Sequence, residues 1–220
     1  MLINQKLITK NFTKGRGGKK ITHIVIHDTA NIGRGANAEA HYKYFNTTTR
    51  EASAHYVVDD KQVLRIVKDE DTAWHCGDNQ KYTNGGGSLK NIVKNSNSIG
   101  IEICVNSDGN YKVAVEKTLE LVKELMVKYK LPIENVVRHY DVTGKICPQS
   151  MSKDNWKAWF DFKKELSGEK DGIKLIFKGK EYIIDGVMKD DKNYVGIREL
   201  SELLGFEVDW DNVNKVVIIK

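Results

Sequence analysis

The chain has 220 residues, of which 40% are hydrophobic and 30% are charged, a composition that predicts a globular protein. No window approaches the ~18 apolar residues needed to cross a bilayer, so we expect no integral membrane contact. The net charge of +5 divides unevenly: residues 1–166 hold 26 Lys+Arg and 19 Asp+Glu, whereas residues 167–220 hold 9 and 11. The basic front fits a polyanionic partner or plain solubility, but it contains no recognisable nucleic-acid recognition element, so we expect no nucleic acid.

The amino-terminal stretch MLINQKLITKNFTKGRGGKK has no apolar core of the length that a secretory signal needs. Signal-dependent export is therefore not expected, which leaves a chain that stays inside, one that leaves by another route, or a mature fragment. The three cysteines, Cys76, Cys104 and Cys147, are an odd number and too few for a disulfide framework, which favours reduced thiols.

The first half of the chain is dominated by predicted strands. ITHIVIHDT is dense in β-branched residues and predicts a buried strand that ends at Thr29, and residues 36–46 predict a short helix. SAHYVVDD and KQVLRIVKD predict a hairpin that turns at Asp59, Asp60 and Lys61. Residues 76–98, rich in Gly, Asn and Ser, predict a functional rim or a mobile loop before the strand NSIGIEICVN.

Two helices follow. Residues 114–130 place apolar side chains at helical spacing, with Pro132 just beyond the end: Val115, Leu119, Val122, Leu125, Met126 and Tyr129. Residues 154–166 predict a second helix that has Trp156, Trp159 and Phe160 on one side and Asp154 as its cap. Strands that alternate with helices predict an α/β layered domain.

The polar stretch SGEKDG, residues 167–172, predicts a linker between a domain of residues 1–166 and a small α+β domain of residues 173–220. In the small domain we expect a hairpin over residues 173–185 and a helix within residues 194–205 that ends at Gly205. A second hairpin over residues 206–220 should turn at Asp211 and Asn212.

The stretch RHYDVTGKICP, residues 138–148, contains two potential zinc ligands. A catalytic zinc commonly takes three ligands from His, Cys, Asp or Glu and keeps a fourth position open. His139 and Cys147 can meet at one ion if Gly144 lets the chain fold back. The alternative is a satisfied surface histidine next to a buried cysteine.

The third ligand must come from elsewhere, and His23 and His27 are the candidates. On a strand they stand roughly 13 Å apart and cannot share an ion. His27 lies at the carboxyl end of its strand, where α/β sheets open their clefts. We therefore choose His27 and assign His23 to packing.

Hydrolysis also needs a base and a cation near the reacting carbonyl. Alternation in IGIEICV places Glu102 and Cys104 on the face opposite the isoleucines. A carboxylate in so apolar a strand is costly to bury, which makes Glu102 a candidate base; an ion pair on an exposed sheet face is the alternative. Lys145 could point into the same cleft or be a solvated loop lysine.

The motifs IVIHDT, SAHYVVD, DTAWHCG, SIGIEIC and RHYDVTGKICP occur in this order within residues 20–165. Together they resemble the zinc-dependent N-acetylmuramoyl-L-alanine amidases of type 2, a fold shared with peptidoglycan recognition proteins. The resemblance implies a central mixed sheet flanked by helices, Zn²⁺ held by His27, His139 and Cys147, and Glu102 and Lys145 as catalytic residues. The bond cut would be the peptidoglycan amide between N-acetylmuramic acid and L-alanine.

Further motif positions bear on substrate and proton transfer. Trp74 and His75 resemble the AWHxG rim of the family, which implies contact with the glycan strand or stem peptide; core packing of Trp74 is the alternative. Some phage members carry a catalytic tyrosine where this chain has Ala54, so Glu102 would carry more of the proton transfer. His55 and Tyr56 are expected to be structural or supporting.

The segments YVGIRELSELLGFEVDW and VVIIK resemble the copper amine oxidase N-terminal-like module of clostridial cell-surface proteins, which carries no copper. This resemblance implies wall binding or self-association; a structural cap is the alternative. Together the two parts predict a phage endolysin that stays in the host cytoplasm until lysis and then acts on the wall. An exported bacterial autolysin is one rival, and a non-hydrolytic peptidoglycan receptor, disfavoured by Cys147, is another.

Overall fold

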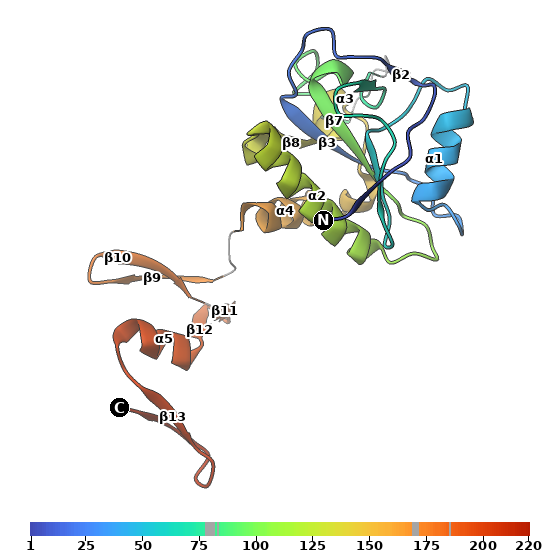
Figure 1. Ribbon diagram of the computed structural model, residues 1–220. Coiled ribbons are helices and arrows are strands. Elements are labelled where there is room, and N and C mark those ends of the chain that lie inside the picture. Colours follow the sequence, from blue (N-terminus) through green and yellow to red (C-terminus); the bar gives the residue numbers. More distant parts are fainter. Residues whose placement is uncertain (78–81, 83, 169–171, 185) are drawn as a thin grey trace. The chain divides into compact units, whose positions relative to one another are not determined.

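The computed structural model describes residues 1–77, 82, 84–168, 172–184 and 186–220 (Figure 1). The chain divides into two compact units, Met1–Ser167 and Gly168–Lys220. Parts of the predicted rim (78–81 and 83) and of the predicted linker (169–171) lie outside the described residues.

The first unit is built on a six-stranded mixed sheet in the order β1–β5–β4–β7–β3–β8. The strands are β1 (Ile3–Gln5), β3 (His23–Asp28), β4 (Tyr56–Val58), β5 (Val63–Arg65), β7 (Ser98–Ile103) and β8 (Val136–Arg138). Strand β3 pairs in parallel with both β7 and β8, and β5 forms the predicted antiparallel hairpin with β4. A small ribbon of β2 (Phe12–Thr13) and β6 (Thr72–Ala73) lies outside this sheet.

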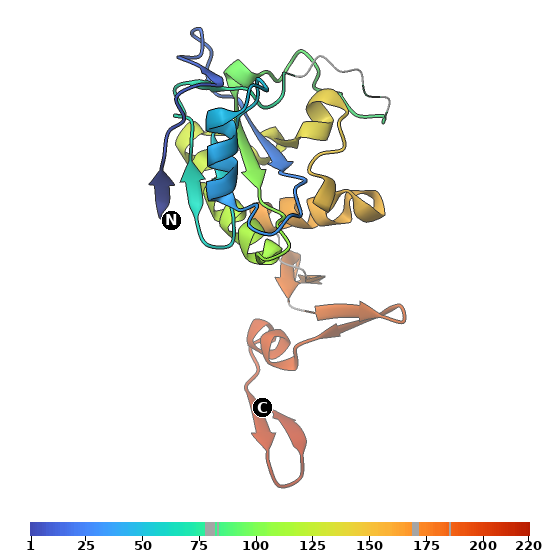
Figure 2. The ribbon, with the colours of Figure 1, turned by 90° about the vertical axis from the view of Figure 1, so that its right-hand side faces the viewer.

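Helices cover both faces of the sheet (Figures 1 and 2). Helix α1 (Ala38–Thr47) covers one face, and α2 (Tyr111–Tyr129) with α4 (Lys153–Ser167) covers the other. The alternating isoleucines of β3 and β7 are fully buried against α2 and α4, as their spacing predicts: Ile24, Ile26, Ile99, Ile101 and Ile103. The predicted fold class, a mixed sheet flanked by helices, is confirmed.

Helix ends follow local sequence chemistry. The side chain of Asn37 accepts a hydrogen bond from the backbone of Ala40 at the start of α1, and Asn110 caps α2 in the same way. In α4 the predicted apolar side is partly wrong: Phe160 is 59% exposed, whereas Phe162 packs beside Trp159 in the core. A residue three positions from Trp159 shares its helix face, and the next residue does not.

The chain around the predicted ligand stretch is more ordered than a turn. Strand β8 runs directly into α3 (His139–Thr143), which ends at Gly144 in the left-handed region, φ 84°. Single turns of 3₁₀ helix occur at η1 (Asn95–Asn97), η2 (Ile133–Asn135) and η3 (Gln149–Met151). Asp154, which was predicted to cap α4, lies within that helix instead, with φ 50°, so the predicted cap is wrong.

The described residues of the second unit form three hairpins and one helix. Its elements are β9 (Ile173–Phe177), β10 (Lys180–Ile184), β11 (Gly186–Lys189), β12 (Lys192–Val195), α5 (Ile197–Leu204), β13 (Val208–Asp211) and β14 (Val216–Ile219). The β11–β12 hairpin was not predicted. The last hairpin turns over residues 212–215, because Asp211 is still paired with Val216. Among the described residues, none of the helices combines the length and apolar character that a membrane span requires.

Candidate active site

Three side chains from separate segments converge at the carboxyl edge of the sheet. His27 lies near the end of β3, and His139 is the first residue after the neighbouring parallel strand β8. Gly144 then reverses the chain and brings Cys147 back to the same point. The potential ligand atoms of the three residues all lie within 4.8 Å of one another, and all three residues are buried.

The geometry of these three donors fits a zinc ion. Nδ1 of His27 is 3.7 Å from Sγ of Cys147, and the rings of His27 and His139 are 4.5 Å apart between centroids. Ligands of a tetrahedral zinc with ordinary bond lengths are about 3.3–3.6 Å apart. Burial raises the pKa of the Cys147 thiol well above its usual value, and burial also lowers the pKa of His27. A divalent cation would offset the first effect by stabilising the thiolate.

Glu102 projects from the same face of the sheet as His27. The two residues are paired in register across β3 and β7. Oε2 of Glu102 is buried and makes no hydrogen bond within the described part of the chain. Burial, with a smaller contribution from the Asp28 carboxylate and opposed by Lys145, raises the pKa of Glu102 to about 8. The alternative of an ion pair on an exposed sheet face does not describe this enclosed carboxylate.

Lys145 borders two cavities that adjoin the three donors. One, of about 430 Å³, is also lined by Glu102 and Cys147. The other, of about 490 Å³, is lined by His139, Trp74 and His75 as well. Lys145 is exposed, and its positive charge acts to lower the pKa of both Glu102 and Cys147. The ammonium group of Lys145 is thus available to a substrate in either cavity.

Asp28 is a site residue that sequence reasoning missed. Its Oδ2 accepts a hydrogen bond from the backbone of Ser150 at 2.5 Å, and its Oδ1 is buried without a hydrogen bond among the described residues. It lines the same cavity as Glu102 and raises the pKa of that residue. The signal was available, because a carboxylate closing an apolar strand is as costly to bury as Glu102.

Both ring nitrogens of His75 are engaged in hydrogen bonds. Nδ1 of His75 is 3.1 Å from Nε2 of His27, and Nε2 of His75 is 3.2 Å from Oγ of Ser98. His75 can therefore contact a substrate only through ring carbons, which narrows the role predicted for it. Trp74 is half-buried, and its indole N–H donates to Oγ1 of Thr13.

His23, His55 and Tyr56 make contacts within the framework of the first unit. His55 is fully buried, and its Nδ1 accepts a hydrogen bond from the backbone of Gly100. Tyr56 donates its hydroxyl proton to Asp69 at 2.6 Å. His23 is half-buried, with Nδ1 at 2.9 Å from the hydroxyl of Thr22. These contacts agree with the structural roles expected for them.

Comparison with known proteins identifies the family. The family model for N-acetylmuramoyl-L-alanine amidase, Amidase_2, matches residues 17–150. The N-acetylmuramoyl-L-alanine amidase CwlH of Bacillus subtilis (strain 168) is 34% identical over 139 residues, which cover 63% of this chain and 51% of CwlH. The chain spans about half the length of the curated relatives it matches.

Two solved structures resemble most of the chain. The catalytic domain of XlyA, a Bacillus subtilis amidase, has a TM-score of 0.62 and 32% identity, and the match covers 76% of this chain and 99% of that one. A mutant endolysin from Bacillus subtilis has a TM-score of 0.62 and 34% identity over the same shares. The family match extends from the loop before β3 to the residues just after Cys147. The chain therefore belongs to the Amidase_2 family of N-acetylmuramoyl-L-alanine amidases.

Proposed function

We propose that the chain is a zinc-dependent N-acetylmuramoyl-L-alanine amidase that hydrolyses the peptidoglycan amide between N-acetylmuramic acid and L-alanine. The observation that carries this proposal is the convergence of His27, His139 and Cys147 beside the enclosed carboxylate of Glu102. Family membership and the amidase names of the curated relatives support it.

His27, His139 and Cys147 would hold the zinc ion through one donor atom each. Three protein ligands leave a coordination position for a reactant, as catalytic zinc sites require. When bound, zinc supplies Lewis-acid chemistry, which polarises an amide carbonyl and makes water more nucleophilic. A non-hydrolytic receptor of the same fold would not need a catalytic zinc, so the presence of all three ligands, Cys147 included, favours the enzyme over the receptor.

Glu102 is the proposed general base and acid. Its pKa of about 8 lies near neutral pH, and a cation bound nearby would lower it. The carboxylate would take a proton from the attacking water and deliver it to the leaving amine of L-alanine. Lys145, on the rim of the same cavity, would stabilise the negative charge that develops on the carbonyl oxygen. With Ala54 in place of a tyrosine, Glu102 would carry more of the proton transfer.

The substrate would lie in the cleft lined by Trp74 and His75. Trp74 also lines a larger cavity, of about 690 Å³, whose rim carries Lys19, Lys90 and Lys94. Ammonium groups around this cavity suit the carboxylates of a peptidoglycan stem peptide. We therefore propose that the glycan and stem peptide contact Trp74 and the ring carbons of His75.

The two units would divide the work. We propose residues 1–166 as the catalytic domain and residues 173–220 as an accessory domain for wall binding or self-association, joined by residues 167–172. The resemblance to an endolysin structure supports a phage endolysin that is held in the host cytoplasm until lysis and then acts on the wall. A bacterial autolysin would use the same chemistry after export.

Digestion of purified cell wall tests the reaction directly. The full chain should release new L-alanine amino termini, identified by labelling and mass spectrometry. A strong chelator should abolish the release, and added zinc should restore it. Activity that persists in the chelator, or new termini other than L-alanine, would contradict the proposal.

A further inference from the structure

A chain of hydrogen bonds leads away from the proposed metal ligand His27. Nε2 of His27 meets Nδ1 of His75 at 3.1 Å, and Nε2 of His75 meets Oγ of Ser98 at 3.2 Å. The hydroxyl of Ser98 donates to the backbone carbonyl of Lys94 at 2.6 Å. Four groups from β3, the segment after β6, β7 and the loop before η1 are linked in one line.

The last acceptor sets the direction of every proton in this chain. A backbone carbonyl can only accept, and that of Lys94 is 2.6 Å from Oγ of Ser98, closer than Nε2 of His75 at 3.2 Å or Sγ of Cys76 at 3.8 Å. We therefore assign the single proton of the Ser98 hydroxyl to the hydrogen bond with Lys94. Ser98 must then accept from Nε2–H of His75, which leaves Nδ1 of His75 without a proton. That nitrogen accepts from Nε2–H of His27. A neutral imidazole carries one ring proton, so Nδ1 of His27 presents a lone pair.

That lone pair is on the nitrogen that faces Cys147, at 3.7 Å from Sγ. The other tautomer of His27 would place a proton at the metal position and a lone pair opposite the lone pair of His75. Metal-ligating histidines depend on such an outer partner to orient the ring and select the ligand nitrogen.

Strand β7 is shaped to hold His75 in this position. Gly100 lies between Ser98 and Glu102 on the same face of the strand. A Cβ atom at Gly100 would lie no more than 2.7 Å from three atoms of the His75 ring, a distance that side chains do not tolerate. Three alternate residues of β7 thus have linked roles. Ser98 accepts the hydrogen bond of His75, Gly100 leaves space for the His75 ring, and Glu102 is the proposed base.

The geometry points to His75 as a positioning residue that, through Ser98, sets the tautomer of His27 and directs Nδ1 of His27 at the metal. This inference rests on the proposed zinc site and deepens it. It gives His75 a role beyond the rim contact that the motif implies, and it gives Gly100 and Ser98 a part in metal binding although neither reaches the ion.

Long-range ¹H–¹⁵N correlation spectra of the full-length ¹⁵N-labelled protein read each tautomer directly. At pH 7.5 and without metal, His27 should be protonated at Nε2 and unprotonated at Nδ1, and His75 should show the same pattern. In His75→Leu, which keeps bulk but no nitrogen, the preference of His27 should be lost. Zinc affinity, measured by chelator competition, should fall about 10–100-fold.

Two further variants make the test specific. In His75→Gln the carboxamide can accept from His27 and donate to Ser98, so most of the zinc affinity and the His27 tautomer should return. His23 lies on the same strand and face as His27, but its Nδ1 contacts the hydroxyl of Thr22. His23→Leu should therefore change neither the tautomer of His27 nor the zinc affinity. If His75→Leu fails to fold, Ser98→Ala removes the hydrogen-bond acceptor of His75 with a smaller change and should mix the tautomers of His75, and through it those of His27.

The inference is overturned if wild-type His27 is protonated at Nδ1, or if His75→Leu binds zinc as tightly as the wild type. The tautomer is read without zinc and without substrate. A wild-type protein that shows the expected tautomer but releases no L-alanine termini would therefore refute the proposed reaction and leave this inference standing.

Discussion

The two units differ in how far their apolar side chains are buried. In Met1–Ser167 the sheet isoleucines and the facing helix residues are buried on both sides. In Gly168–Lys220 only Ile184 and Ser201 are buried among the described residues, and side chains such as Met188 and Trp210 are 72% and 46% exposed. A unit of about 50 residues supports only a marginal core, and we expect the exposed apolar side chains of this unit to take part in binding.

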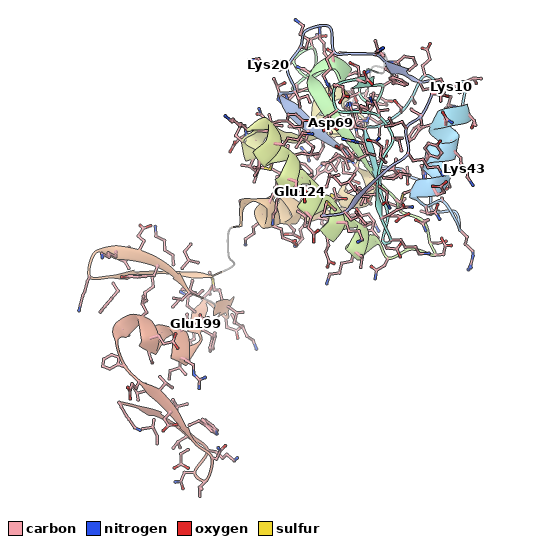
Figure 3. The ribbon with its side chains drawn as sticks, viewed as in Figure 1. Lys10, Lys20, Lys43, Asp69, Glu124 and Glu199 are labelled. Atoms are coloured by element: carbon pink, nitrogen blue, oxygen red, sulfur yellow. The ribbon has the colours of Figure 1, made fainter. Side chains whose placement is uncertain are left out.

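Polar interactions show the same contrast. In the first unit, Asp69 (labelled in Figure 3) is buried and accepts hydrogen bonds from Tyr56, Lys128 and Tyr129. In the second unit, ion pairs such as Lys174 with Glu181 are exposed to solvent. Exposed pairs contribute little to stability, whereas a buried charge with a full set of donors is costly to disturb. The described residues of the first unit thus include a buried carboxylate with a full set of donors, whereas the ion pairs described in the second unit are exposed.

The largest expected effect tests whether the chemistry belongs to the first unit alone. Glu102→Gln removes the proposed base while keeping the size of the side chain, so hydrolysis of soluble muropeptide should fall about 10²–10⁴-fold. Zinc content, measured by mass spectrometry, should not change. The matched substitution in the second unit, Glu202→Gln in α5, should leave the rate as it was. A near-wild-type rate for Glu102→Gln would remove this residue from the mechanism.

The next largest effect concerns the buried carboxylate of Asp69 and tests whether polar interactions stabilise the first unit more than the second. Asp69→Ala leaves Lys128 and two tyrosine hydroxyls without their shared acceptor and should lower the free energy of unfolding of the first unit by about 3–5 kcal/mol. Urea denaturation followed by tryptophan fluorescence measures this change. Asp209→Ala, which removes an exposed carboxylate from β13, is the control and should have no measurable effect. If the two substitutions lowered the free energy of unfolding equally, the proposed difference between the two units would be wrong.

Truncation after Ser167 separates the units outright. Hydrolysis of soluble muropeptide should stay within about twofold of the full chain, because the site lies wholly in the first unit. Attack on whole cell walls should fall at least about tenfold if the second unit supplies a second attachment. Equal loss on both substrates would instead make the second unit part of the amidase fold.

The smallest expected effect is a pH dependence of stability. Burial acts to raise the pKa of Asp69, but hydrogen bonds from Lys128, Tyr129 and Tyr56 outweigh it, so the folded-state pKa lies below the ordinary value. A depressed carboxylate pKa contributes stability that is present above about pH 4 and is lost as pH falls through the folded value. The difference in melting temperature between wild type and Asp69→Asn should therefore be constant near neutral pH and shrink below about pH 4. A difference that grows on acidification would show the opposite sign of coupling.

The sequence by itself determined the elements whose pattern is local. β-Branched alternation identified β3 and β7, and helical spacing identified α2. Motif order pointed to His27, His139 and Cys147 and to Glu102 on the opposite face from the isoleucines. The strand and helix inferences depend on neighbours within one element, where backbone geometry dictates which side chains share a face. The ligand set depended instead on the resemblance that the motifs carry across residues 20–165.

Only the tertiary structure decided what lies against each face. Periodicity cannot show that His75 rests on Gly100, or that Asp28 lies close enough to raise the pKa of Glu102. Nor could it show that the apolar residues of the second unit stay exposed. Such contacts join segments distant in sequence, and they depend on strand order and chain reversal, which local propensity does not encode.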